Sequence, residues 1–140
     1  MGQETTVEFI DNSGRIKSLI DMECNAWLHE AGMELTSQVK RNTRVDTGET
    51  KNSWTYLVDG VHNEVQVGSN LENAIWEEFG TGQYALHGDG RKTEWTYEGK
   101  DGTFHRTKGK RPNRALQNAF NTMKNKIINM LKERLERVGR

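Results

Sequence analysis

The segment Val45-Asp46-Thr47-Gly48 contains the residue types of a proteolytic site. It matches the loop of aspartic proteases, in which two close carboxylates share one proton, and a homodimer could supply the second loop. Those carboxylates are buried among apolar strands, whereas polar and charged residues flank Asp46 on both sides. Since Asp and Gly also favour turns, the sequence predicts an exposed turn between a helix and a strand.

Gly80, Gly82 and Ala85 have the spacing of a glycine-rich loop that lets the backbone approach the phosphates of a dinucleotide. That fingerprint requires a strand before the glycines and a helix after them. Here the residues before Gly80 have helical periodicity, and those after Gly82 form a polar, glycine-rich run. The context therefore argues against a nucleotide site.

The helix before these glycines is predicted to be short. Leu71, Ile75 and Phe79 recur at every fourth position, so they share one face that we expect to anchor the helix to the core. Ser69 and Glu72 have the spacing of a capping box at its start, and the glycine after Phe79 is a natural stop.

The other candidate catalytic or metal-binding residues are few. His87 and Asp89 are close in sequence, but no second ligand lies at a recurring metal spacing. Glu77 and Glu78 could act as acid and base, although such pairs are more often surface charges or interface salt bridges. Cys24 is the single cysteine and is expected to be packed in a helix. The sequence thus predicts no enzyme site, metal or cofactor.

Composition indicates one domain with a modest core. The chain has 140 residues, of which 33% are hydrophobic, and one domain is the usual expectation for this length. Part of the stability is therefore expected to come from a partner surface. No long apolar run resembles a signal peptide or a membrane span, so we expect a protein of intracellular origin with no membrane partner.

Charge is distributed unevenly although the formal net charge is zero. Residues 1–80 hold six Lys and Arg against 14 Asp and Glu, and residues 81–140 hold 14 against six. This asymmetry favours contacts between unlike halves of neighbouring copies, or a basic surface that meets nucleic acid. Two solvated faces without a partner are the alternative.

Hydrophobic periodicity predicts an α+β fold. Residues 5–9 could form a first strand, a long helix is expected from Gly14 to about Asn42, and Asp59-Gly60 lies between two alternating runs that predict a hairpin. A last helix is expected from Pro112, with one apolar stripe made of Leu116, Phe120, Met123, Ile127, Leu131 and Leu135. The long N-terminal and C-terminal helices are expected to pack on a small antiparallel sheet.

Residues 82–111 are predicted to form a mobile, glycine-rich loop that projects from the body. Trp95 and Tyr97 face Phe104 and His105 across a Gly-Lys-Asp-Gly turn, which predicts a second hairpin. After it come five basic residues without an acid: Arg106, Lys108, Lys110, Arg111 and Arg114. Basic residues beside aromatic ones can bind phosphate backbones or single strands, and a solvated loop is the equal alternative.

Four motifs taken together resemble the gene-product-ten-like family of neck and tail-completion proteins of long-tailed double-stranded DNA phages. The resemblance covers roughly residues 40–135. Its motifs are Val45 to Gly48 with Ser53, Glu78 to Gly82, Gly90 to Thr93 with Trp95, and Pro112, Leu116, Ala119 and Phe120. The last motif departs from the family pattern, because Arg114, Ala115 and Asn118 replace a proline, the phenylalanine and another proline.

The resemblance implies a structural virion assembly protein and no enzyme. It implies a head–tail joining or tail-completion subunit that forms a homo-oligomeric ring, contacts other neck and tail proteins, and is made in the bacterial host cytoplasm. The expected subunit interface is Trp76, Glu77, Trp95, Tyr97 and Phe104. The expected contacts with packaged DNA or an acidic partner are Arg106, Lys108, Lys110, Arg111 and Arg114.

Two other functions stay open at this point. The first is a nucleic-acid-binding module that uses the basic segment 100–114. The second is a hydrolase that uses Asp46 or His87.

Overall fold

The computed structural model describes residues 10–45 and 48–139. The predicted strand at residues 5–9, and Asp46 and Thr47 of the predicted turn, lie outside the described residues. The α+β fold is confirmed. Its elements are α1 Ser13–Asn42, α2 Glu49–Ser53, β1 Thr55–Asp59, β2 Glu64–Gly68, α3 Glu72–Phe79, the short 3-10 helix η1 Gly82–Tyr84, β3 Trp95–Glu98, β4 Phe104–Thr107 and α4 Ala115–Val138.

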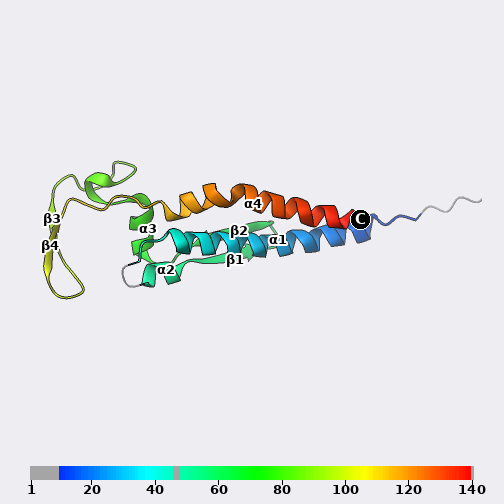
Figure 1. Ribbon diagram of the computed structural model, residues 1–140, viewed down its shortest axis with the longest axis horizontal. Helices are drawn as coiled ribbons and strands as arrows, with labels where there is room; N and C mark the ends of the chain where they lie inside the picture. The colour runs from blue at the N-terminus through cyan, green and yellow to red at the C-terminus, as the bar shows by residue number, and fades with distance from the viewer. Residues whose placement is uncertain (1–9, 46–47, 140) are drawn as a thin grey trace, which may run out of the picture.

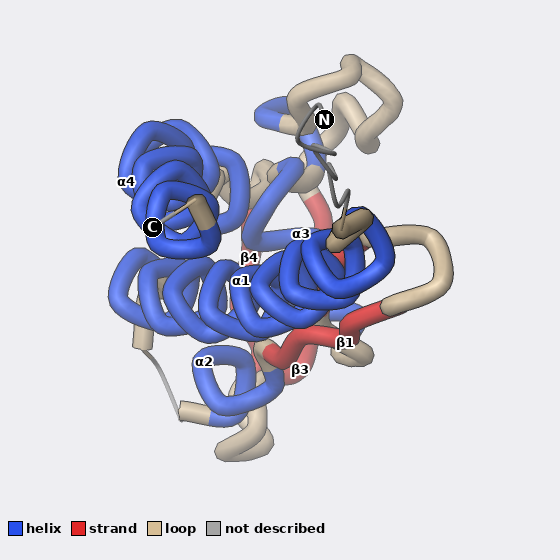
Figure 2. The backbone as a smooth tube through the Cα atoms, turned by 90° about the vertical axis from the view of Figure 1, so that its right-hand side faces the viewer, coloured by secondary structure: helices blue, strands red, loops and turns tan. Residues whose placement is uncertain are grey.

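The long helix α1 lies between α4 on one side and the β1–β2 hairpin on the other (Figures 1 and 2). The strands are antiparallel and pair Tyr56 with Val67 and Val58 with Val65, so these four side chains share the face that meets α1. Gly32 makes this contact possible, because a Cβ atom there would lie 2.4 Å from the Tyr56 ring.

Two buried clusters hold the layers together. The first joins the ends of α1 and α4 to the sheet and α3 through Val39, Trp54, Ala74, Ala115 and Ala119. The second lies further along the two long helices and consists of Ala31, Met123 and Ile127. Each cluster has an indole hydrogen bond beside it: Trp54 Nε1 donates to Thr43 Oγ1 at 2.9 Å, and Trp27 Nε1 donates to the Ile127 carbonyl at 2.7 Å.

The predicted buried stripe of α4 is partly wrong. Met123 and Ile127 are buried as expected, but Ala115 and Ala119 take the remaining inner positions and Phe120 is 52% exposed. Small residues allow two helices to approach closely, whereas a phenylalanine at the same place would hold α4 away from α1. The start is also later than predicted, since Arg114 adopts a left-handed conformation before Ala115.

Ion pairs between the long helices account for part of the charge asymmetry. Lys126 of α4 binds Glu34 of α1 at 3.1 Å, and Arg134 binds both Glu23, at 2.7 Å, and Glu30. The hydrogen bond from Arg134 holds the pKa of Glu30 below its ordinary value, and the two glutamates raise the pKa of Arg134. The unlike halves of the chain thus pair within one molecule.

The second hairpin is confirmed and stands at one end of the molecule, beyond α3 (Figure 1). Its strands β3 and β4 are antiparallel and form a sheet separate from β1–β2. The opposite end of the molecule consists of the start of α1 beside the end of α4 (Figure 1).

Candidate functional site

The orientation of α3 differs from the predicted one. Glu77 and Glu78 are each only 5% exposed, whereas Ile75 and Phe79 lie at the surface although they were expected to anchor the helix. Trp76, an expected interface residue, is also exposed in the single chain. Buried carboxylates need partners. Glu77 pairs with Arg44 and Lys110, and Glu78 pairs with Arg114 and accepts hydrogen bonds from two backbone N–H groups at the start of α4. The capping box is also absent, since α3 begins after Leu71 without a side-chain cap.

Glu78 caps the start of α4 from another helix. Its carboxylate accepts hydrogen bonds from the backbone N–H groups of Leu116 at 2.9 Å and Gln117 at 3.0 Å, and it lies 3.6 Å from the Arg114 guanidinium. The first N–H groups of a helix have no partner within the helix, and the helix dipole favours a negative charge there. The hydrogen bonds from these two N–H groups to Glu78 of α3 therefore fix where α4 begins.

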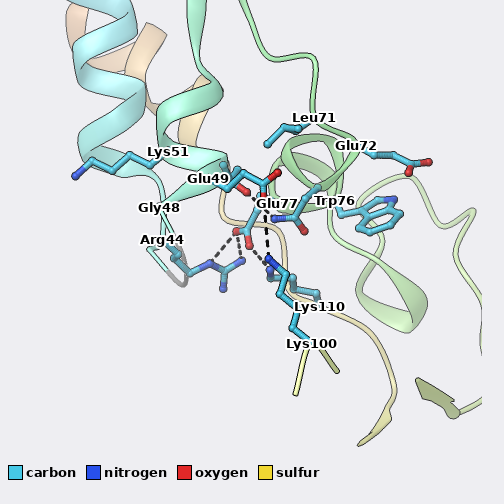
Figure 3. Close-up of a pocket in the computed structure, with 12 residues that line it drawn as sticks. Arg44, Gly48, Glu49, Lys51, Leu71, Glu72, Trp76, Glu77, Lys100 and Lys110 are labelled. Carbon is cyan, nitrogen blue, oxygen red and sulfur yellow. Dashed lines mark hydrogen bonds and ion pairs between the residues drawn. The ribbon is translucent and has the colours of Figure 1, made fainter. Parts of the chain in front are cut away.

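Glu77 anchors the chain on both sides of α3 (Figure 3). Its carboxylate binds Arg44 at 2.9 Å and also binds Lys110. Its backbone carbonyl accepts a hydrogen bond from the Asn113 N–H at 2.6 Å, and Arg44 donates to the Arg111 carbonyl at 2.9 Å. Figure 3 shows the side chains of Arg44, Glu77 and Lys110 meeting. All three line a pocket that has a volume of about 440 Å³.

Glycines allow the base of the second hairpin to pack against the segment after α3. The Gln83 N–H donates to the Lys108 carbonyl at 2.9 Å, so the two backbones lie side by side. A Cβ atom at Gly82 would lie 2.2 Å from that carbonyl oxygen, and one at Gly109 would lie 2.1 Å from the Thr81 oxygen. Gly82, the last residue of the Glu-Phe-Gly-Thr-Gly motif, and Gly109 therefore permit a close approach of the two backbones.

The predicted interface residues divide into three groups. Trp76, Trp95 and Tyr97 line a pocket of about 440 Å³ between α3 and the second hairpin, which we call the aromatic pocket. Phe104 lies on the opposite face of the hairpin, because it pairs with Glu98 and not with Tyr97, and it is 72% exposed. Glu77 is buried within the chain. Whether these surfaces meet a neighbour stays a prediction.

The predicted basic contacts mostly have partners within the chain. Arg106 binds Glu94 at 3.1 Å, and Arg111 lies over the Tyr84 ring at 4.6 Å. Lys110 and Arg114 bind Glu77 and Glu78 as described above. Lys108 is exposed. These contacts give the basic segment a structural role, and contact with DNA stays a prediction.

An apolar groove that the sequence did not predict runs between α1, β2 and α4. This α1–β2–α4 groove has a volume of about 510 Å³. Its apolar lining includes Trp27, Leu35, Val65, Phe120 and Ile128, and Gln117 and Lys124 are its polar lining residues. A smaller groove of about 260 Å³ beside Ile75 and Phe79 shares Leu116 and Gln117 with it. The sequence does contain one indication of this groove, because α4 has more large apolar residues than one helix face can bury.

Residues 10–45 and 48–139 contain no group of three or more His, Cys, Asp or Glu side chains arranged to hold a metal ion. In the same part of the chain, no helix has the length and apolar character needed to span a membrane.

A helical body with an open apolar groove and a projecting aromatic hairpin is typical of a protein that works by contacting other proteins. Comparison with known families agrees. The pattern of the bacteriophage HK97 gp10-like family, which is described as a tail component, matches residues 7–80, more than half of the chain. The chain belongs to this family, and the resemblance stated from its motifs is confirmed. No curated protein and no solved structure matches the chain.

Proposed function

We propose that the protein is a head–tail joining or tail-completion subunit that assembles as a homo-oligomeric ring in the neck of the virion. Its family makes it a structural component of a phage tail. The observation that supports assembly is the pair of open apolar surfaces, one on the projecting hairpin and one along the helical body. The action would be binding and not catalysis.

The arrangement of these surfaces favours a ring. The β3–β4 hairpin, which carries Phe104, lies at the end of the molecule beyond α3 (Figure 1), whereas the exposed Phe120 and Ile128 belong to α4. A contact between unlike surfaces of identical copies is head-to-tail, and such contacts close into a ring when the rotation between copies allows it. Large apolar side chains left in water also favour association.

Electron microscopy and light scattering test this function. The purified protein should show a mass several times that of the 16.1 kDa chain, and rings should be visible alone or at the ends of added tail tubes. A second sample in which the tubes are replaced by an unrelated filament controls for adventitious binding. A protein that stays monomeric and binds no tube end would contradict the proposal.

A further inference from the structure

The second hairpin has one face without a covering element. Pairing places Trp95 opposite Thr107 and Tyr97 opposite His105 on the face of the aromatic pocket. Glu98 and Phe104 lie opposite one another on the other face, and both are exposed. A two-stranded hairpin with one uncovered face is marginally stable alone, so this face is suited to a partner.

Among the residues that the structure describes, Glu98 provides an unpaired negative charge on that face. In the described part of the chain its carboxylate takes part in no ion pair, whereas the neighbouring Arg106 is already balanced by Glu94. The uncovered face therefore offers one large apolar side chain and one unbalanced negative charge.

The α1–β2–α4 groove offers the complementary pair. Phe120 is 52% and Ile128 50% exposed, and both line the groove. Lys124 also lines it and, among the described residues, has no ion-pair partner. Phe120 and Lys124 are four residues apart on α4, so they are neighbours on one helical face. Each surface thus combines an exposed phenylalanine with one charge, and the two charges have opposite sign.

The hairpin of the same molecule is held away from this groove. Backbone hydrogen bonds fix its base: Thr81 N–H donates to the Lys110 carbonyl, and Gln83 N–H donates to the Lys108 carbonyl, both at 2.9 Å. From this base the hairpin extends beyond α3 (Figure 1), while the groove is lined on α4 by residues between Leu116 and Ile128. The occupant must therefore come from another molecule.

We propose that the β3–β4 hairpin of one copy places Phe104 in the α1–β2–α4 groove of the next copy, with Glu98 bound to Lys124. This junction rests on the proposed function, because it names the two surfaces that join the copies of a ring. Each copy contributes one hairpin and one groove, so every added copy leaves one of each open until the ring closes.

Charge reversal provides the test. Glu98→Lys places two positive charges at the junction, and Lys124→Glu places two negative charges there. Each variant alone should associate at least about tenfold more weakly than the natural chain, because like charges facing each other at an interface are unfavourable. Lys132→Glu, an exposed position of α4 outside the groove, is the matched control and should associate normally. Sedimentation velocity measures the association.

Mixing the two variants should restore assembly. In an equal mixture, each hairpin finds a groove of opposite charge on the other variant, so alternating assemblies form. A folding defect would not be repaired by mixing, which separates lost contacts from lost structure. If both single variants associate like the natural chain, or if their mixture does not assemble, the junction is overturned.

The same experiment tests the proposed junction separately from the proposed closed ring. If the natural chain forms open filaments and the charge-reversed pair still rescues them, the junction stands and the closed ring is contradicted. If the natural chain forms rings that ignore both substitutions, the ring stands and the junction is overturned. A natural chain that stays monomeric contradicts both.

Discussion

The adjacent residues Glu77 and Glu78 have different structural roles, because successive side chains of a helix point in different directions. Glu77 neutralises Arg44 and Lys110, and Glu78 satisfies two N–H groups of α4. Both tasks connect α3 to residues more than 30 positions away, so local sequence rules do not reveal them. The sequence suggested acid–base chemistry or a surface pair for residues that instead organise the fold.

Removing the Glu78 cap should weaken the whole fold. Glu78→Ala leaves two part-buried N–H groups and the Arg114 charge without this carboxylate, and we expect a loss of about 2–3 kcal/mol in the free energy of unfolding. Glu133→Ala, an exposed position of α4, should change stability by less than about 0.5 kcal/mol. Urea unfolding measures both. Equal effects would mean that Glu78 is not a cap.

Two glycines allow the strain of backbone conformation to be separated from steric contact. Gly82 and Gly88 both have positive φ, at +60° and +71°, but a Cβ atom is blocked only at Gly82, by the Lys108 oxygen. Gly88→Ala should cost about 1 kcal/mol in unfolding free energy, and Gly82→Ala about 1–3 kcal/mol more. Thermal unfolding of the two variants gives this difference. A smaller loss for Gly82→Ala than for Gly88→Ala would contradict the close backbone approach.

At the scale of elements, small residues set the distance between α1 and α4. Ala119 is fully buried and Phe120 is half exposed. Phe120→Ala should therefore cost less than about 1 kcal/mol, whereas Ala119→Leu should cost about 1–3 kcal/mol by overpacking. Chemical denaturation compares them. A loss of about 3–5 kcal/mol for Phe120→Ala, the usual cost at a buried phenylalanine, would restore the face predicted from the sequence.

The stability that the ion pair between Glu30 of α1 and Arg134 of α4 provides should depend on pH. Arg134 lowers the pKa of Glu30, whose ordinary value is 4.5. The stabilisation is therefore complete above about pH 5 and declines as the pH falls below 4.5 and Glu30 takes up a proton. Arg134→Gln should lower stability at neutral pH by an amount that shrinks in this acidic range. Lys132→Gln serves as the control. A difference that is constant with pH would exclude the linkage.

The elements that follow from local pattern were predictable, and those decided by distant contacts were not. The long helix α1, the β1–β2 hairpin and the second hairpin are visible in periodicity and turn residues. The start of α4 is not, because it depends on Glu78 and on the left-handed Arg114. The α1–β2–α4 groove was missed for the same reason, since a pattern shows that a helix has an apolar face but not how much of it a neighbour covers.

At the scale of the whole molecule, the body and the hairpin are organised differently. The body has two buried clusters and ion pairs between its long helices. The hairpin is held at its base by backbone hydrogen bonds and leaves Phe104 in solvent. A well-packed body that carries a projecting hairpin suits the proposed subunit, because the hairpin can contact another copy while the body keeps its own fold.

The short helix α3 touches both ends of the proposed junction. Trp76 lines the aromatic pocket beside the hairpin, while Ile75 and Phe79 line the smaller groove that adjoins the α1–β2–α4 groove. Holding the hairpin in a neighbour would therefore also restrain the helix beside the groove that receives the next copy. Assembly should then be cooperative: light scattering after dilution from denaturant should show a lag that shortens with preformed assemblies as seeds. Trp76→Ala removes the α3 side chain that lines the aromatic pocket, so it should weaken the coupling and shorten this lag. Growth of the natural chain without any lag would show that the two surfaces act independently.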